Sequence, residues 1–373
     1  MYRIESELAA LKGQNNFRMI PHGSDNAVAD FSSNDYLGIG ADESFQKDFI
    51  QSLSNIPLLT SSASRLLAHN QNEYFELESL LESFYGLPAL LFNSGYHANT
   101  GLISTLGDKN TLIVADKLVH ASIIDGYKLS EADMVRFRHN DVGHLEKILK
   151  SKAGDYARVI IVVEGVYSMD GDSAPISDIV TLKTRFENTL LYVDEAHSFG
   201  VCGNGGLGLT ADFPDADKID IMVGTFGKAA ASMGAFAVMK PMLKEYAINR
   251  ARSFIFSTAI PPFNCAWTKY VVERIPAMKD RRDKLQKVIG TFVENLDSEK
   301  VNIKHPSHII PVIVGDSEKA IRLSKHLYQE GLKVLPIRTP TVPPGTERLR
   351  ISFSSSLSVE DAKRLALTLN KLL

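Results

Sequence analysis

The chain has 373 residues, of which 44% are hydrophobic and 23% are charged. This length and composition predict a globular protein with a large buried core and about two domains. The formal net charge is -3, so no strong overall field draws the chain toward nucleic acid or an anionic membrane. We therefore expect the partner to be a small molecule, with neither nucleic acid nor a membrane involved.

Two features favour a cytoplasmic protein. Residues 1–21 contain acidic side chains without the apolar centre of a signal peptide, and no apolar run in the sequence is long enough to span a bilayer. The cysteines, Cys202 and Cys265, lack the paired spacing of a metal site, and such sparse use of cysteine is typical of a reducing compartment. We expect neither a disulfide framework nor a bound metal.

The first elements in chain order are a separate N-terminal segment over 1–45 and an amphipathic helix within 70–87. The apolar face of this helix comprises Tyr74, Leu77, Leu80, Leu81 and Phe84. From there to about residue 240, apolar runs alternate with helix-like segments, which is typical of an α/β protein with a mostly parallel sheet. The expected strands lie within 89–95, 111–116, 134–139, 158–166, 189–197, 221–228 and 234–240.

The pattern changes in the last third of the chain. A long charged amphipathic helix is expected at 278–296, short strands at 309–315 and 348–353, and a last helix that is opened by Ser358 and Asp361. These elements predict a smaller α+β domain over 265–373. The large domain then covers 46–264.

The end of the run 189–197 reads Asp-Glu-Ala-His, which is typical of the magnesium site in helicase-type ATPases. Such enzymes also need a phosphate loop of the form G-x-x-x-x-G-K-[ST]. The only Gly-Lys pair here ends at Lys228, is followed by Ala229, and has Met222 in place of the first glycine. The ATPase interpretation therefore lacks its phosphate site.

Three further patterns resemble ligand-binding motifs but lack features that those motifs require. The segment 203–208 fits G-x-G-x-x-G by letter, but it lies too far beyond its strand, and we expect a flexible loop. The segment 169–178 lacks the ligand spacing and final glutamate of a calcium loop. His305 and His308 have no third ligand nearby in the sequence, so we expect both to be surface histidines.

The residues that follow the expected strands are chemically unusual. In a doubly wound sheet these positions share one crevice at the carboxyl ends of the strands. They offer an amine, a carboxylate, flat imidazoles, and small residues suited to a phosphate, which together match the needs of pyridoxal phosphate (PLP). The set comprises Ser94, Gly95, Tyr96, His120, Ser168, Asp194, His197, Thr225 and Lys228.

Several segments resemble the α-oxoamine synthases over essentially the whole chain. They are FSSNDYLG (31–38), HNDVGHLEKIL (139–149), VVEGVYSMDGDSAP (162–175), YVDEAHSFGV (192–201), TFGKA (225–229), STAIPP (257–262), PVIVGD (311–316) and TPTVPPGTERLRIS (339–352). The resemblance implies a fold-type I PLP enzyme that forms a homodimer with its sites at the subunit interface. Members of this family condense an amino acid with an acyl thioester and release carbon dioxide.

The resemblance also implies a role for individual residues. Lys228 would bind the cofactor covalently, Asp194 would pair with its ring nitrogen, and His120 would stack on its ring. His197 and Ser168 would contact the ring oxygen. Taken alone, His197 could equally be a core histidine, and Ser168 could equally be a turn residue. The remaining cofactor positions would be Gly95, Tyr96, Thr225 and, from the partner subunit, Thr258, and the substrate positions would be Arg18, Asn34, Thr341 and the carboxylate-binding Arg350.

The substrates are less sharply implied. The segment 339–350 favours L-alanine and a pimeloyl thioester, carried by coenzyme A or by an acyl-carrier protein. Glycine acetyltransferase, 5-aminolevulinate synthase and serine palmitoyltransferase share the core chemistry, and a non-catalytic PLP-binding homologue is a further alternative. The residues after Lys228 depart from the family's glycine-rich pattern, because alanines occupy 229–231, and 58–70 likewise lacks the expected glycines.

Overall fold

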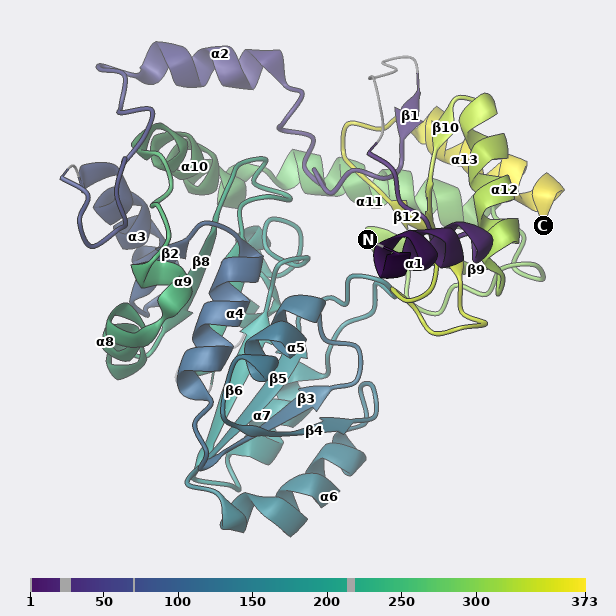
Figure 1. Cartoon of the computed structure of the whole chain (residues 1–373). Coiled ribbons are helices and arrows are strands. Elements are labelled where there is room, and N and C mark those ends of the chain that lie inside the picture. The colour runs from purple at the N-terminus through teal and green to yellow at the C-terminus, as the bar shows by residue number, and fades with distance from the viewer. Residues whose placement is uncertain (1, 21–27, 70, 213–218) are drawn as a thin grey trace. The chain divides into compact units, whose positions relative to one another are not determined.

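Figure 1 shows the computed structural model, which describes residues 2–20, 28–69, 71–212 and 219–373. The chain divides into two compact units. The larger unit comprises Leu37–Ser168 and Ser173–Lys279, and the smaller comprises Met1–Tyr36, Met169–Asp172 and Asp280–Leu373. This division differs from the three expected ranges, because α10 (Pro262–Arg274) packs on α3 (Asn72–Tyr85) and β1 (Ala29–Asp30) pairs with β10 (Leu332–Lys333).

The larger unit contains a seven-stranded sheet in the order β2-β8-β7-β6-β5-β3-β4. The strands are β2 (Ala89–Phe92), β3 (Thr111–Asp116), β4 (Asp133–Phe137), β5 (Arg158–Glu164), β6 (Thr189–Asp194), β7 (Ile221–Thr225) and β8 (Ala235–Met239). Only the pairs of β8, with β2 and with β7, are antiparallel. Each of the seven expected apolar runs supplies one strand, so the α/β fold with a mostly parallel sheet is confirmed.

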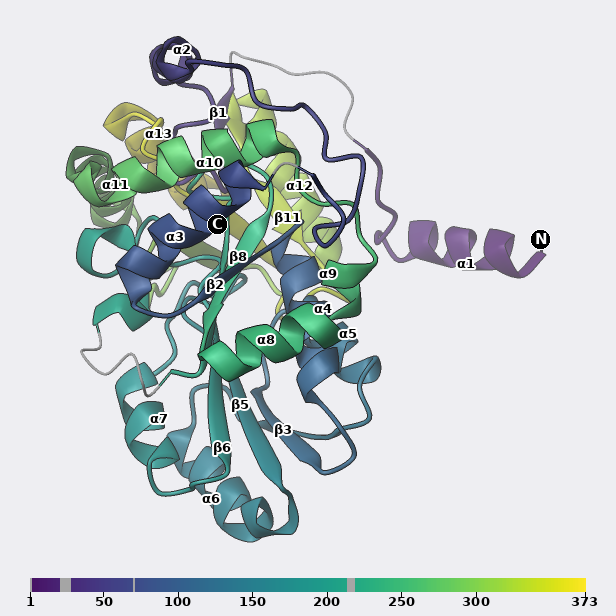
Figure 2. The ribbon, with the colours of Figure 1, turned by 90° about the vertical axis from the view of Figure 1, so that its left-hand side faces the viewer.

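Helices cover both faces of this sheet, which explains why several of its strands are apolar nearly throughout. α4 (Gly95–Leu106) packs on β7 and β8, α7 (Ile176–Lys183) packs on β6, and Figure 2 shows these two helices on opposite sides of the strands. The other helices of the unit are α2 (Glu43–Ser52), α5 (Ala121–Lys128), α6 (Val142–Lys152), α8 (Pro241–Arg250) and α9 (Arg252–Ile255). Among the described residues, no helix is long and apolar enough to cross a bilayer.

The smaller unit is an α+β structure around a three-stranded antiparallel sheet in the order β11-β12-β9. The strands of this sheet are β9 (Ile309–Ile313), β11 (Leu335–Ile337) and β12 (Arg348–Ser352). The helices of the unit are α1 (Tyr2–Gly13), α11 (Lys279–Asn295), α12 (Ser317–Gln329) and α13 (Val359–Leu372). Ser358 caps α13 by accepting the backbone N–H of Asp361 at 3.0 Å, as its sequence predicts.

The first four residues of the segment 169–178, which was considered above as a calcium loop, belong to the smaller unit. The guanidinium of Arg348 contacts the Asp170 carboxylate at 2.7 Å. Gly171 has a φ of +72°, and a Cβ at that position would collide with the carbonyl oxygen of Ile309. Residues 169–172 therefore pack against other residues of the smaller unit. No group of three acidic, histidine or cysteine side chains suited to a metal occurs among the described residues.

The expectation that His308 lies at the surface is wrong. Its side chain is 1% exposed, and its ring meets the ring of Tyr36 edge-on at 4.4 Å. The carbonyl of His308 also accepts the N–H of Phe353 at 2.9 Å. The residue directly precedes β9, and the pairing of that strand carries it into the core of the smaller unit.

Glu195, directly after β6, is a fully buried carboxyl group that binds the backbone just after the glycine-rich segment 203–208. It accepts the backbone N–H of Thr210 at 2.6 Å and of Leu209 at 3.2 Å, and the hydroxyl of Ser198 also donates to it. Burial raises the pKa of Glu195 to about 7, although the bonds from Thr210 and Leu209 act in the opposite direction.

This raised pKa predicts a stability that falls with pH. The native state holds the Glu195 proton up to about pH 7, whereas the unfolded chain loses it near 4.5. The stabilisation is therefore full below the lower value and is lost as the pH rises through the higher one, by up to about 3 kcal/mol. Glu195→Gln should flatten the slope of the unfolding free energy, measured with urea between pH 4.5 and 8. The exposed Glu131→Gln is the control, and equal slopes in all three proteins would contradict the prediction.

Candidate active site

Three neighbouring parallel strands bring polar side chains to one edge of the large sheet. Asp194 ends β6 and lies in register with Glu164, which ends β5. Thr225 ends β7, on the other side of β6. Because the carboxyl ends of parallel strands meet at one edge, the topology fixes these residues as a row.

The carboxylate of Asp194 is oriented by hydrogen bonds to both of its oxygens. Oδ1 accepts the N–H of Ala196 at 2.9 Å, and Oδ2 accepts the side-chain Nδ2 of Asn99 at 2.7 Å. The residue is 4% exposed. A buried carboxylate held in this way can pair with a cationic ring nitrogen and keep it protonated.

His120 caps the N-terminus of α5. Its Nδ1 accepts the backbone N–H of Ser122 at 3.3 Å and lies 2.8 Å from the Ser122 hydroxyl. Burial lowers the pKa of His120; the nearby Asp194 carboxylate opposes this change, and the Lys228 ammonium adds to it. The imidazole is therefore neutral at physiological pH, as a flat ring that stacks on another ring should be.

Lys228 lies on the loop that follows β7. The Thr225 hydroxyl accepts the N–H of Gly227 at 3.3 Å, and the carbonyl of Lys228 accepts the N–H of Ala231 at 2.9 Å. The lysine ammonium interacts electrostatically with His120 and Glu164. The sheet edge thus brings together the amine, the carboxylate of Asp194 and the imidazole that the sequence predicts.

The alanines after Lys228 have different environments. Ala229 and Ala230 are fully buried. Ala231 has a φ of +45°, and its carbonyl accepts the indole N–H of Trp267 at 3.1 Å. A left-handed conformation costs an alanine about 1–2 kcal/mol relative to the right-handed one. Alanine in place of the glycine that is typical of the family therefore causes backbone strain at one position, Ala231.

The N-terminus of α4 forms a candidate anion site. Ser94 caps the helix by accepting the N–H of His97 at 3.2 Å. A Cβ on Gly95 would lie 3.7 Å from the Cβ of Thr225, so the helix start and the end of β7 are adjacent. Backbone N–H groups and the helix dipole favour a phosphate at such a place. Tyr96, the next residue, is half-exposed, and its hydroxyl donates to Asp125 at 2.8 Å.

Ser168 and His197, expected at the cofactor's ring oxygen, are both buried in segments that follow β5 and β6. The backbone N–H of Ser168 donates to Glu164 Oε2 at 3.3 Å. Burial and, next, the Asp194 carboxylate hold the pKa of Glu164 well above its usual range. Glu164 is thus protonated at physiological pH.

The four expected substrate residues lie in the smaller unit and form two pairs. Both terminal nitrogens of Arg350 contact the Oδ1 of Asn34 at 3.3 Å, and Nη1 also donates to Ser352 at 2.6 Å. The guanidinium of Arg18 donates to the Thr341 hydroxyl at 3.1 Å. Arg350 is buried and oriented, which suits bidentate binding of a carboxylate.

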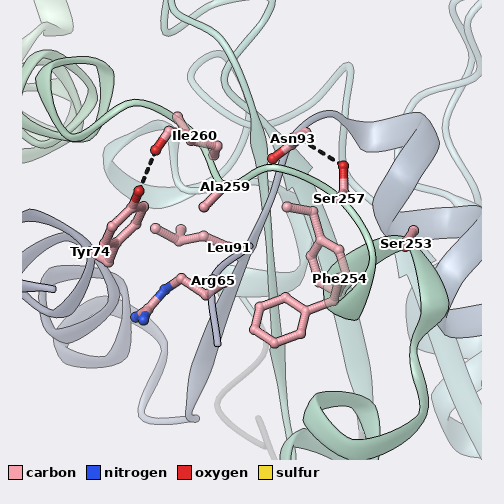
Figure 3. Close-up of a pocket in the computed structure, with 10 residues that line it drawn as sticks. Arg65, Tyr74, Leu91, Asn93, Ser253, Phe254, Ser257, Ala259 and Ile260 are labelled. Atoms are coloured by element: carbon pink, nitrogen blue, oxygen red, sulfur yellow. Dashed lines mark hydrogen bonds between the residues drawn. The ribbon is translucent and has the colours of Figure 1, made fainter. Parts of the chain in front are cut away.

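Thr258 is exposed in the larger unit, and its chain neighbours Ser257 and Ala259 line a small pocket (Figure 3). The carbonyl of Thr258 accepts the side-chain amide of Asn93 at 2.6 Å, and Asn93 also donates to Ser257 at 3.0 Å. The pocket is lined by Arg65, Tyr74, Leu91, Phe92, Asn93, Ser253, Phe254, Ser257, Ala259 and Ile260. None of the expected cofactor residues lines it, so it is distinct from the polar edge of the sheet.

Residues beyond the expected set also belong to this edge. Asn99 and Ser122 are buried polar residues in contact with Asp194 and His120, and Tyr192 donates to Asn99. One sequence signal points to Tyr192, which lies two residues before Asp194 on the same face of its strand, whereas Asn99 is one of several polar residues of α4.

Known proteins resemble this chain over its length. A family model described as aminotransferase class I and II matches residues 26–369. A provisionally named 8-amino-7-oxononanoate synthase of Pasteurella multocida is 45% identical over 99% of this chain and 98% of its own. A solved 8-amino-7-oxononanoate synthase of Francisella tularensis has a TM-score of 0.78 and 29% identity, and covers 93% of this chain and 98% of its own. A serine palmitoyltransferase variant from S. paucimobilis was solved with a bound PLP–myriocin adduct. It has a TM-score of 0.88 and 27% identity, and covers 99% of this chain and 96% of its own.

The chain therefore belongs to the class I and II aminotransferase family and is a PLP-dependent transferase of fold type I. Within that family, its relatives place it among the α-oxoamine synthases. The residues fit the cofactor. They supply a lysine amine, a buried and oriented carboxylate, a neutral imidazole and a helix N-terminus for the phosphate.

The first prediction for this site concerns Lys228. Borohydride reduction of the PLP-loaded protein should fix the cofactor on this lysine, because its amine shares the sheet edge with Asp194 and His120. Lys228→Ala should carry no covalent cofactor, as measured by absorbance and by peptide mass spectrometry. Lys109→Ala is the control and should label normally. Label on another lysine would overturn the assignment.

The second prediction concerns Asp194. Asp194→Asn should still bind PLP but lose most turnover, because a neutral amide cannot hold the ring proton as a carboxylate does. A charged hydrogen bond of this kind contributes about 1.5–3 kcal/mol, which corresponds to a fall in kcat of roughly tenfold or more. The exposed Asp178→Asn should behave as wild type. A normal kcat in Asp194→Asn would refute the role.

Proposed function

We propose that the protein condenses L-alanine with a pimeloyl thioester, carried by coenzyme A or an acyl-carrier protein, to give 8-amino-7-oxononanoate, carbon dioxide and the free thiol. This is a step of biotin biosynthesis. The observation that supports it most strongly is the 45% identity, over nearly the full length of both chains, with a protein named for that product. A cytoplasmic location stays a prediction from the sequence.

The polar edge of the sheet supports the chemistry. Bound PLP supplies an electron sink that stabilises negative charge on the α-carbon of the amino acid. The Asp194 carboxylate keeps the ring nitrogen protonated, which deepens that sink. The Nζ of Lys228 removes the α-proton as a general base and later returns a proton to the same carbon. His120 donates a hydrogen bond that assists loss of carbon dioxide.

Residues of the smaller unit support a role in substrate binding. We assign the alanine carboxylate to Arg350, whose guanidinium is held by Asn34 and Ser352. Arg18 and Thr341, which are hydrogen-bonded to each other, are assigned to substrate as well. The acyl chain needs mostly apolar surroundings, because it presents methylene groups with a polar end.

The protein is proposed to act as a homodimer. The exposed side chains of Ile56, Leu59, Leu67 and Phe256 are apolar and are each at least 70% exposed. Their two segments are adjacent, since the N–H of Ala259 donates to the carbonyl of Ala63 at 2.9 Å. Apolar side chains in such number favour a protein interface. Exposed Thr258 lies beside them and is assigned to the cofactor phosphate of the partner subunit.

A panel of amino acids against acyl thioesters, with thiol release as the readout, tests the proposal. Alanine should be preferred over serine by roughly tenfold or more if the serine hydroxyl is left unpaired, at about 1–3 kcal/mol. Glycine should be a closer competitor, because one methyl contributes only about 1 kcal/mol. Pimeloyl-CoA should outcompete acetyl- and palmitoyl-CoA.

A serine palmitoyltransferase activity is the second candidate, since the TM-score of 0.88 to such an enzyme exceeds the 0.78 to the Francisella synthase. Preference for serine with palmitoyl-CoA would select it and reject the proposal. Preference for glycine with acetyl-CoA would indicate a glycine acetyltransferase. No turnover with any pair, together with normal PLP binding, would indicate a non-catalytic homologue.

A further inference from the structure

A chain of hydrogen bonds that is buried except at the exposed His120 joins Asp194 to this histidine. The hydroxyl of Tyr192 lies 2.7 Å from Asn99 Oδ1, and Asn99 Nδ2 lies 2.7 Å from Asp194 Oδ2 and 2.9 Å from the Ser122 hydroxyl. That hydroxyl lies 2.8 Å from His120 Nδ1. Tyr192, Ser122 and Asn99 are all nearly or completely inaccessible to solvent.

The chemistry of the groups fixes the direction of every bond in this chain. A carboxylate can only accept, so the group of Asn99 that faces Asp194 is its NH₂, and its carbonyl oxygen accepts from Tyr192. The second N–H of Asn99 then donates to the Ser122 oxygen. The backbone N–H of Ser122, which can only donate, also faces His120 Nδ1, so this nitrogen is an acceptor and the Ser122 proton can be directed to it.

We propose that Asn99 and Ser122 are positioning residues that hold His120 as the tautomer with its proton on Nε2. The backbone N–H of Ser122 points at Nδ1 from 3.3 Å, so a proton on that nitrogen would face another N–H, and the Ser122 hydroxyl at 2.8 Å can then donate to the same nitrogen. The remaining ring nitrogen, Nε2, is therefore the donor. This inference rests on the proposed function only for its kinetic consequence.

The arrangement also links two roles at the site. The same Asn99 amide orients the carboxylate assigned to the ring nitrogen and, through Ser122, the imidazole assigned to the ring face. A change at Asn99 should thus alter the protonated nitrogen of His120 and the catalytic rate together, whereas substrate affinity should be little affected.

The test is ¹⁵N NMR of the full-length protein labelled at histidine, with and without PLP. The chemical shifts of the two imidazole nitrogens show which one carries the proton, and His120→Gln identifies the resonances. The wild type should show Nε2–H. In Asn99→Asp the donors are lost, the Ser122 hydroxyl can donate to the introduced carboxyl, and its oxygen can accept from Nδ1. We expect an Nδ1–H signal and a kcat at least about tenfold lower, as for loss of a proton donor, with the KM for alanine unchanged.

A second variant introduces no charge. Ser122→Ala removes the hydroxyl donor and should move the Nδ1 resonance toward that of a nitrogen without a hydrogen bond. Ser104→Ala is the matched control on α4, because the Ser104 hydroxyl bonds only to its own helix, at 2.6 Å to the carbonyl of Thr100 and 3.2 Å to that of Gly101. It should leave the His120 signals and kcat unchanged.

Several outcomes would overturn the inference. They are Nδ1–H in the wild type, unchanged His120 signals in both Asn99→Asp and Ser122→Ala, or equal shifts in Ser104→Ala. The proposed function is tested separately by the substrate panel. A wild type with Nε2–H that does not turn over alanine and pimeloyl-CoA would refute the function and leave the hydrogen-bond chain standing.

Discussion

The parallel pairing of β5, β6 and β7 is the constraint on which the site depends. Parallel strands end at the same edge, so the register that places Asp194 beside Glu164 also brings Thr225 and the loop of Lys228 there. The pairing of the strands by itself brings these residues close together. The sheet supplies the geometry, and the residues at its edge supply the chemistry.

That edge concentrates ionisable groups in a poorly hydrated place, where a charge is costly unless it is compensated. Glu164 responds by staying protonated and His120 by staying neutral, for which burial is the main cause. Asp194 instead receives two hydrogen bonds, one from Ala196 and one from Asn99. Glu164 is thus neutralised by a proton, whereas hydrogen bonds orient the carboxylate assigned to the cofactor.

The sequence predicts the large sheet and its chemical edge well, because apolar strands and the residues after them form a local pattern. All seven strands and the grouping of Lys228, Asp194 and His120 follow from it. His308 was wrongly expected at the surface, since its burial comes from strand pairing in the smaller unit. The hydrogen bond between Tyr192 and Asn99 joins β6 to α4, and residue spacing in the sequence does not show such a contact.

The position of β2 in the sheet has a consequence for how the chain folds. β2 is an outermost strand of the sheet, and within the part of the chain that the structure describes its one strand partner is β8, which the ribosome makes well over one hundred residues later. Until β8 emerges, the apolar strand Ala89–Phe92 has no place to pair. Such late closure slows folding and leaves an exposed strand in the nascent chain. Truncations that end before Met239 should therefore aggregate rather than yield a smaller folded unit.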